Sequence, residues 1–169
     1  MNALRLIAPV LLTLSAGQAG VVTAQDTPLT EAAKVLYYPE AADGPAVLKQ
    51  ALTKAATLDR PAVIVFGADW CHDSRALGKV LTSDAFKAEF SNRYDVTFID
   101  VGRPQTGEGR NLDLVKWLGV KHLKSTPALF LISPQGRLLN GKKDAVSWRN
   151  AESRGTDKVL AWFRELNRR

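Results

Sequence analysis

The spacing of apolar residues in the first half of the chain predicts a buried strand with one helix before it and one helix after it. Apolar residues recur at helical spacing after Asp43-Gly44-Pro45, where the aspartate can cap a helix and the proline fits its first turn. Arg60-Pro61 ends that helix, and residues 62–66 form a continuous apolar run, typical of a strand covered on both faces. A second helical stretch with one bend is expected from Cys71 to about Phe90.

The second half of the chain continues this alternation of strands and helices. It predicts, in order, a strand at 96–101, a polar loop at 102–110, a short helix at 111–118 with Asn111 as its capping residue, a strand at 128–132, a turn at 133–136, a hairpin partner at 137–139, an irregular stretch at 140–155 and an amphipathic helix capped by Thr156. Alternation followed by a hairpin predicts an α/β fold with a central mixed sheet and helices on both faces.

The first 24 residues have the pattern of a secretory signal peptide, with a basic start at Arg5 and an apolar run over residues 6–14. Val22-Thr23-Ala24 then presents small or compact residues, which predicts cleavage after Ala24. The alternative is an N-terminal membrane anchor, but the apolar run is shorter than the roughly 20 residues that a spanning helix needs. We therefore expect export, with no stable membrane insertion after cleavage. Residues 25–43 predict an irregular leader with one helical turn after Thr30.

Composition and charge narrow the possible partners. The 169 residues are 46% hydrophobic and 24% charged, which excludes a disordered or low-complexity chain, and the length suits one monomeric domain. The net charge is +6 at pH 7. Arg164, Arg168 and Arg169 lie at the end of the chain and other basic residues are dispersed among acids, without the concentrated basic stripe of a nucleic-acid-binding protein. We therefore expect no nucleic-acid partner and a basic surface that favours anionic ones.

A single cysteine excludes any disulfide within the chain and directs attention to its surroundings. Cys71 follows the apolar run at 62–66 and begins the next helix, where free amide groups and the helix dipole stabilise a thiolate. The alternative is an inert, buried cysteine. The charged neighbours of Cys71 argue against full burial; they are Asp69, His72, Asp73 and Arg75.

Three stretches of the chain resemble the thioredoxin-like superfamily, in particular secreted bacterial proteins in which a strand ends in W-C-x-x-C. These stretches are residues 63–75, residues 96–101 with the glycine-rich loop and 111–113, and residues 125–131 with the turn at 134–136. The resemblance covers roughly residues 45–166 and implies a thioredoxin-like domain over residues 44–169, located in the periplasm. It also implies that Pro127 is a cis-proline facing Cys71, and that Thr126 offers backbone hydrogen bonds to a bound peptide.

The sequence departs from this family at the position of the second cysteine, which is Ser74. Serine cannot resolve a mixed disulfide, and Val65 replaces the buried aspartate of many relatives, so a dithiol reductase or oxidase is not expected. The loop at 119–127 also looks longer than the family's compact version. The prediction is monothiol exchange with protein or low-molecular-weight thiols and disulfides, with Cys71 and Ser74 as catalytic residues. Ser74 is expected to hydrogen-bond the thiolate. The residues expected to bind substrate are Trp70, His72, Thr126 and Pro127.

Other functions remain to be weighed against thiol exchange. A redox-inactive module that binds peptides or assists folding would use Trp70 and the edge at Thr126-Pro127 but not the thiol. A metal site built from Cys71, His72, Asp73 and His122 is disfavoured, because adjacent residues at a helix start point in different directions. The chain lacks the motif of a serine hydrolase and of a phosphate-binding loop. We therefore expect neither a metal nor another cofactor.

Overall fold

The computed structural model describes residues 35–168. The signal peptide expected at residues 1–24 and the helical turn expected after Thr30 lie outside these residues. Within them, no helix is both long enough and apolar enough to cross a membrane.

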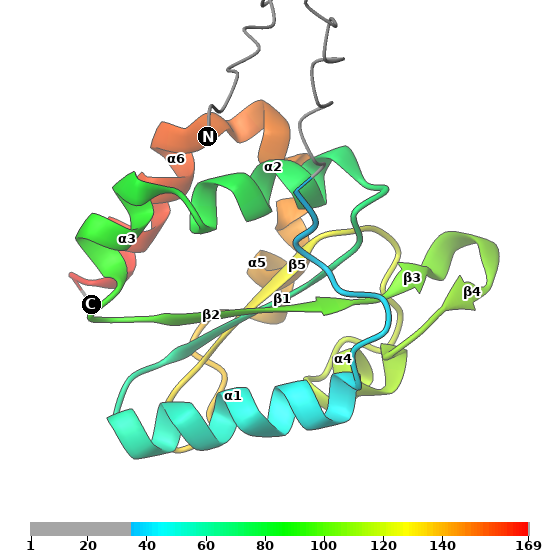
Figure 1. Cartoon of the computed structure of the whole chain (residues 1–169), viewed down its shortest axis with the longest axis horizontal. Helices are drawn as coiled ribbons and strands as arrows, with labels where there is room; N and C mark the ends of the chain where they lie inside the picture. The colour runs from blue at the N-terminus through cyan, green and yellow to red at the C-terminus, as the bar shows by residue number, and fades with distance from the viewer. Residues whose placement is uncertain (1–34, 169) are drawn as a thin grey trace, which may run out of the picture. The chain divides into compact units, whose positions relative to one another are not determined.

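The centre of the fold is a three-stranded sheet with strand order β2-β1-β5 (Figure 1). Strand β1 is Ala62–Gly67, β2 is Asp95–Asp100 and β5 is Ala128–Ile132. β1 pairs with β2 in parallel and with β5 in antiparallel orientation, so the mixed sheet is confirmed. Each strand lies within one residue of its predicted bounds. Because β1 is the middle strand, its C-terminal end brings the following loop next to both neighbouring strands.

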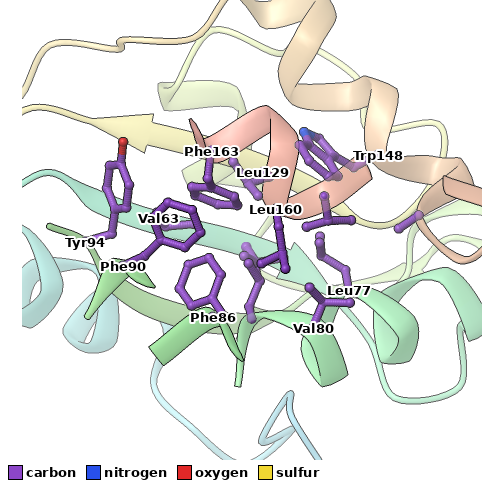
Figure 2. Close-up of a cluster of buried hydrophobic side chains, with 14 of the residues drawn as sticks. Val63, Leu77, Val80, Phe86, Phe90, Tyr94, Leu129, Trp148, Leu160 and Phe163 are labelled. Carbon is purple, nitrogen blue, oxygen red and sulfur yellow. The ribbon is translucent and has the colours of Figure 1, made fainter. Parts of the chain in front are cut away.

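Alternating side chains of the strands form two hydrophobic clusters, one on each face of the sheet. Val63 and Val65 lie on one face with Leu129, and Ile64 and Phe66 lie on the other. The first cluster is covered mainly by α2 (His72–Leu81), α3 (Asp84–Phe90) and α6 (Ala151–Leu166), as Figure 2 shows. The second is covered by α1 (Gly44–Leu58), α4 (Leu112–Trp117) and α5 (Lys142–Ala145). Helices on both faces are therefore confirmed.

The start of α1 and the interruption of the helical stretch after β1 agree with the predictions from the sequence. Asp43 caps α1 by accepting a hydrogen bond from the backbone N–H of Ala46 (3.1 Å). The predicted bend is a complete break between α2 and α3, where the Ser83 hydroxyl accepts a hydrogen bond from the N–H of Phe86 (3.2 Å).

The stretch at 102–110 is more ordered than the loop that its polarity predicts. It folds into a two-stranded ribbon of β3 (Gly102–Arg103) and β4 (Glu108–Gly109), joined by a 3₁₀ turn at Pro104–Thr106. Asn111 lies at the N-cap position of α4, but its side chain does not cap the helix. Its amide instead donates a hydrogen bond to the carbonyl oxygen of Asp100 (2.8 Å), so the capping prediction is wrong.

The predicted irregular stretch at 140–155 is also wrong, because it contains α5, a 3₁₀ turn at Val146–Asn150 and the start of α6. Gly155 interrupts α6 with non-helical torsion angles (φ 70°, ψ 169°), immediately before the predicted helix start at Thr156. The hairpin partner at 137–139 forms only a single bridge, between Ile132 and Leu138.

Asn140 explains why this hairpin is short. Its side-chain oxygen accepts a hydrogen bond from the N–H of Leu131 (2.8 Å), and its amide nitrogen donates to the carbonyl oxygen of Leu129 (2.9 Å). These two bonds take the place of a continued strand ladder beside β5.

Candidate functional site

Cys71 lies at the junction between the central strand and α2. β1 ends at Gly67, a turn closes with the N–H of Cys71 bonded to the carbonyl oxygen of Ala68 (3.0 Å), and Cys71 occupies the N-cap position of α2. The residue is only 7% exposed, so the expectation that its charged neighbours keep it from burial is wrong. Its side chain makes no capping hydrogen bond to the helix.

The thiol of Cys71 has one hydrogen-bond partner, which comes from a distant part of the chain. Sγ donates to the carbonyl oxygen of Thr126 at 3.4 Å. The peptide bond between Thr126 and Pro127 is cis, and both residues are buried immediately before β5. The Thr126 hydroxyl is buried without a partner. The pairing of β5 with β1 thus brings together three of the predicted site residues: Cys71, Thr126 and Pro127.

The charged side chains of Asp69 and Arg75 form hydrogen bonds with backbone groups. Because their polar atoms have these partners, the two residues can lie beside a buried thiol. The carboxylate of Asp69 accepts hydrogen bonds from the N–H groups of Tyr37 (3.0 Å) and Tyr38 (2.9 Å). Nη1 of Arg75 donates to the carbonyl oxygens of Asp69 (2.8 Å) and Trp70 (3.0 Å). These bonds fix the loop between β1 and α2 and tie it to the segment that precedes α1.

Tyr38 packs directly behind the site, a contact that the sequence analysis missed. Its hydroxyl donates to the carbonyl oxygen of Ser74 (3.2 Å), and burial raises the pKa of the phenol well above its ordinary value. A Cβ atom at Gly67 would lie 2.6 Å from the Tyr38 ring and 2.8 Å from Ser74 Oγ, so this close approach requires glycine. The one available signal was the aromatic pair Tyr37-Tyr38 within an otherwise irregular leader.

Ser74 does not make the contact expected of it. The residue is fully buried (0% exposed), and its hydroxyl has no hydrogen-bond partner, so the predicted hydrogen bond to the Cys71 sulfur is wrong. The side chain lies instead against the position that a Cβ of Gly67 would take, next to the Tyr38 ring.

His72 is exposed and contacts carboxylates. Its Nε2 lies 3.2 Å from Asp73 Oδ2 and 3.7 Å from Glu152 Oε2. Asp73 also accepts a hydrogen bond from the N–H of Glu152 (2.9 Å), which links the start of α2 to the start of α6. A role for His72 in substrate binding stays a prediction.

Trp70 stands at the surface beside Cys71 and is 39% exposed. Its indole N–H donates to the carbonyl oxygen of Gly102 (2.8 Å), and the Arg103 guanidinium lies 5.0 Å from the ring centroid. Gly102 in turn donates its N–H to Asp100 Oδ2 (2.9 Å). Burial raises the pKa of the Asp100 carboxyl, while this N–H and the nearby Arg110 act against the shift. The β3–β4 ribbon therefore orients the indole.

The residues weighed and disfavoured as metal ligands in the sequence do not form a cluster in the structure. Among residues 35–168, no group of three or more histidine, cysteine, aspartate or glutamate side chains could hold a metal ion. His122 lies in the loop after α4 and lines a cavity with basic side chains rather than with Cys71.

Comparison with solved structures shows similarity to proteins that share this fold. No family model and no curated protein matches the chain. A crystal structure of a disulphide isomerase from Xylella fastidiosa Temecula1 aligns with 79% of this chain and 98% of its own, at 28% identity and a TM-score of 0.69. The C-terminal domain of DsbD from Neisseria meningitidis, in its reduced form, aligns with 72% of this chain and 95% of its own, at 23% identity and a TM-score of 0.47. The predicted thioredoxin-like α/β fold is confirmed.

Proposed function

We propose that this protein, which has a thioredoxin-like fold, carries out thiol–disulfide exchange through the single sulfur of Cys71. The observation that carries the proposal is the contact between Cys71 Sγ and the carbonyl oxygen of Thr126, next to the cis bond to Pro127. This contact supports a site in which a substrate binds through its backbone at Thr126. The sulfur of that substrate would then lie beside the Cys71 thiol. The similarity to a protein described as a disulphide isomerase supports the same class of reaction.

The exchange consists of two displacement steps. The Cys71 thiol loses its proton, and the thiolate attacks one sulfur of a substrate disulfide R–S–S–R′. The S–S bond breaks, a bond between Cys71 and the R sulfur forms, and R′ leaves as a thiolate. A second thiolate, from a free thiol or from another cysteine of the substrate, attacks the R sulfur and releases Cys71. When the second thiol belongs to the same substrate, its disulfides are rearranged without net oxidation.

Ser74 is the reason to propose a monothiol reaction. A hydroxyl cannot replace the thiol that would displace the substrate from within the same motif. Because Cys71 is the one cysteine of the chain, the second displacement needs a thiol from another molecule. The partners we propose are therefore protein disulfides and low-molecular-weight thiols.

A chromogenic disulfide tests this function. A neutral cysteine peptide joined to 2-nitro-5-thiobenzoate should release the coloured thiolate on reaction with the protein and leave a peptide adduct on Cys71, detected by intact mass. Cys71→Ala should abolish both signals. Reaction no faster than that of a free cysteine peptide at the same pH would refute thiol exchange as the function.

The burial of Cys71 favours a second candidate, a module that binds peptides without redox chemistry. In that case Cys71→Ala should bind partner polypeptides as well as the parent protein does, and no covalent partner should be trapped under oxidising conditions.

We further propose that the protein acts after export, in the periplasm. The pattern of the first 24 residues supports this location. The mass of the exported protein tests it, because cleavage after Ala24 predicts an N-terminus at Gln25.

A further inference from the structure

A cavity of about 320 Å³ opens beside the loop that carries Thr126. Ser125, the preceding residue, lines it, as do Lys142 and Lys143 at the start of α5. Since the carbonyl oxygen of Thr126 accepts the hydrogen bond from Cys71, the cavity begins one residue away from the backbone partner of the thiol.

The walls of this cavity carry positive charge that the described part of the chain does not neutralise. The basic residues that line it are His122, Lys124, Lys142, Lys143 and Arg149. Within residues 35–168, none of them forms an ion pair with a carboxylate within 4.0 Å. Asp144, the adjacent acid of α5, accepts a hydrogen bond from Asn140 instead (3.1 Å).

Lys142 reaches across the cavity to the loop after α4. Its Nζ would lie 2.7 Å from a Cβ atom at Gly119, so the absence of a side chain there gives the ammonium group its room. Gly119 also has a positive φ of 92°, which disfavours other residues. The loop and α5 therefore form one cationic wall.

The surface beside Trp70, the residue before Cys71, has a different charge pattern. A second cavity, beside Trp70, is lined by two arginines and two glutamates. Arg110 pairs there with Glu40 (3.3 Å) and with Asp100 (3.3 Å). Basic residues therefore outnumber acidic ones in the lining of the cavity beside Ser125, whereas the two are equal in number in the lining of the cavity beside Trp70.

We propose that the cavity beside Ser125 binds a carboxylate side chain of a polypeptide substrate, so that Cys71 reacts preferentially with disulfides flanked by aspartate or glutamate. This inference rests on the proposed function and names its substrate class. The basic residues of the cavity come from three segments of the chain and are more numerous than one carboxylate needs. Their number favours a polypeptide with several acidic residues. Complementary charge of this kind increases the rate of association and selects among partners.

A set of matched peptides tests the inference on the full protein. Each peptide carries one cysteine joined to 2-nitro-5-thiobenzoate. The residues that flank this cysteine are glutamate in one peptide, glutamine in the second and lysine in the third. The rate constant for colour release by the protein is divided by the rate constant with which a free cysteine peptide reacts with the same mixed disulfide. This ratio corrects for the charge of the substrate peptide itself. We expect the glutamate peptide to react about fivefold faster than the glutamine peptide. The preference should shrink in 0.5 M salt, where exposed charges are screened.

Charge-removing variants locate the effect. The triple variant Lys142→Gln, Lys143→Gln and Arg149→Gln should bring the ratio between the glutamate and glutamine peptides close to one. The control variant Lys79→Gln, Lys87→Gln and Arg93→Gln removes the same charge from residues that do not line the cavity, and should keep the preference. No preference in the parent protein, or an equal loss in both variants, overturns the inference.

Two further comparisons separate the other outcomes. Dithiodiglycolate, a small disulfide with two carboxylates, should show no comparable preference over bis(2-hydroxyethyl) disulfide; an equal preference that the triple variant also loses overturns the assignment to a polypeptide. Failure of every peptide to exceed the free-cysteine rate refutes the proposed function instead. In that event, the fluorescence anisotropy of a labelled glutamate peptide with Cys71→Ala and with the triple variant still measures binding at the cavity.

Discussion

Asp69 Oδ2 accepts a hydrogen bond from the backbone N–H of Tyr38 at 2.9 Å, which ties the loop before Cys71 to a segment 31 residues earlier in the chain. The other carboxylate oxygen accepts the N–H of Tyr37. Both N–H groups would otherwise lack a partner near the protein interior, and a buried donor without one is costly. The carboxylate thus fixes the segment that delivers Tyr38 behind the site.

Asp69→Asn is expected to lower the free energy of unfolding by about 1–3 kcal/mol. Asparagine keeps one acceptor oxygen, but its NH₂ group would face the second backbone N–H. Urea denaturation followed by circular dichroism measures the change. Asp157→Asn replaces an exposed aspartate of α6 and should change the stability by less than about 0.5 kcal/mol. Equal effects of the two substitutions would contradict a structural role for the Asp69 carboxylate.

The raised pKa of Tyr38 predicts a loss of stability at high pH. The unfolded chain ionises this phenol near pH 10, whereas the folded chain keeps its proton, so the unfolded state binds fewer protons above about pH 10. Stability should therefore fall as the pH rises, with a slope from this group that approaches about 1.4 kcal/mol per pH unit once the unfolded phenol is ionised. Tyr38→Phe should remove that contribution from the slope between pH 10 and 11. Tyr37→Phe is the matched control and should keep it; a slope that Tyr38→Phe leaves unchanged would contradict the prediction.

Ser74→Ala is expected to stabilise the fold by about 1 kcal/mol, because it removes a buried hydroxyl that has no hydrogen-bond partner. Ser133 provides a matched comparison, since it is also buried but its hydroxyl accepts hydrogen bonds from the N–H groups of Gln135 and Arg137. Ser133→Ala should therefore destabilise by about 1–2 kcal/mol. Thermal unfolding of both variants gives the two signs, and a loss of stability in Ser74→Ala would contradict the prediction.

Phe163→Ala should cost about 3–5 kcal/mol, because this ring lies at the centre of the aromatic cluster in Figure 2. Its centroid is 4.9 Å from that of Phe86, 5.4 Å from Tyr94 and 4.9 Å from Trp162. Trp117 is 65% exposed, and Trp117→Ala should cost less than about 1 kcal/mol. Chemical denaturation measures both, and similar losses would contradict the assignment of the core.

Local signals account for the parts of the fold that could be predicted. The apolar runs of β1 and β5 lie between turn residues, and Asp43 with Pro45 marks the start of α1 within the sequence itself. Such signals need no knowledge of distant residues, and they are strong where one side chain caps or terminates an element.

The contacts of the site could be predicted only in part, because they join segments far apart in the chain. The spacing of residues around Cys71 indicated a helix start, but it did not reveal that Asp69 bonds to residues 31 and 32 positions earlier. Nor did the motif spacing show that Ser74 faces Tyr38 and Gly67 instead of the thiol. The basic cavity escaped notice for the same reason, since its residues form no run in the sequence.

The bonds from Asn140 to β5 have a consequence for the behaviour of the protein in concentrated solution. β5 is at one edge of the sheet, and an edge strand with free N–H and C=O groups is a template for pairing with another chain. The Asn140 amide occupies the N–H of Leu131 and the carbonyl oxygen of Leu129, and the N–H of Leu139 bonds to the carbonyl oxygen of Leu131. The Asn140 side chain and the Leu139 backbone thus occupy three of the groups through which another chain could pair with this edge, where the strand itself is entirely apolar.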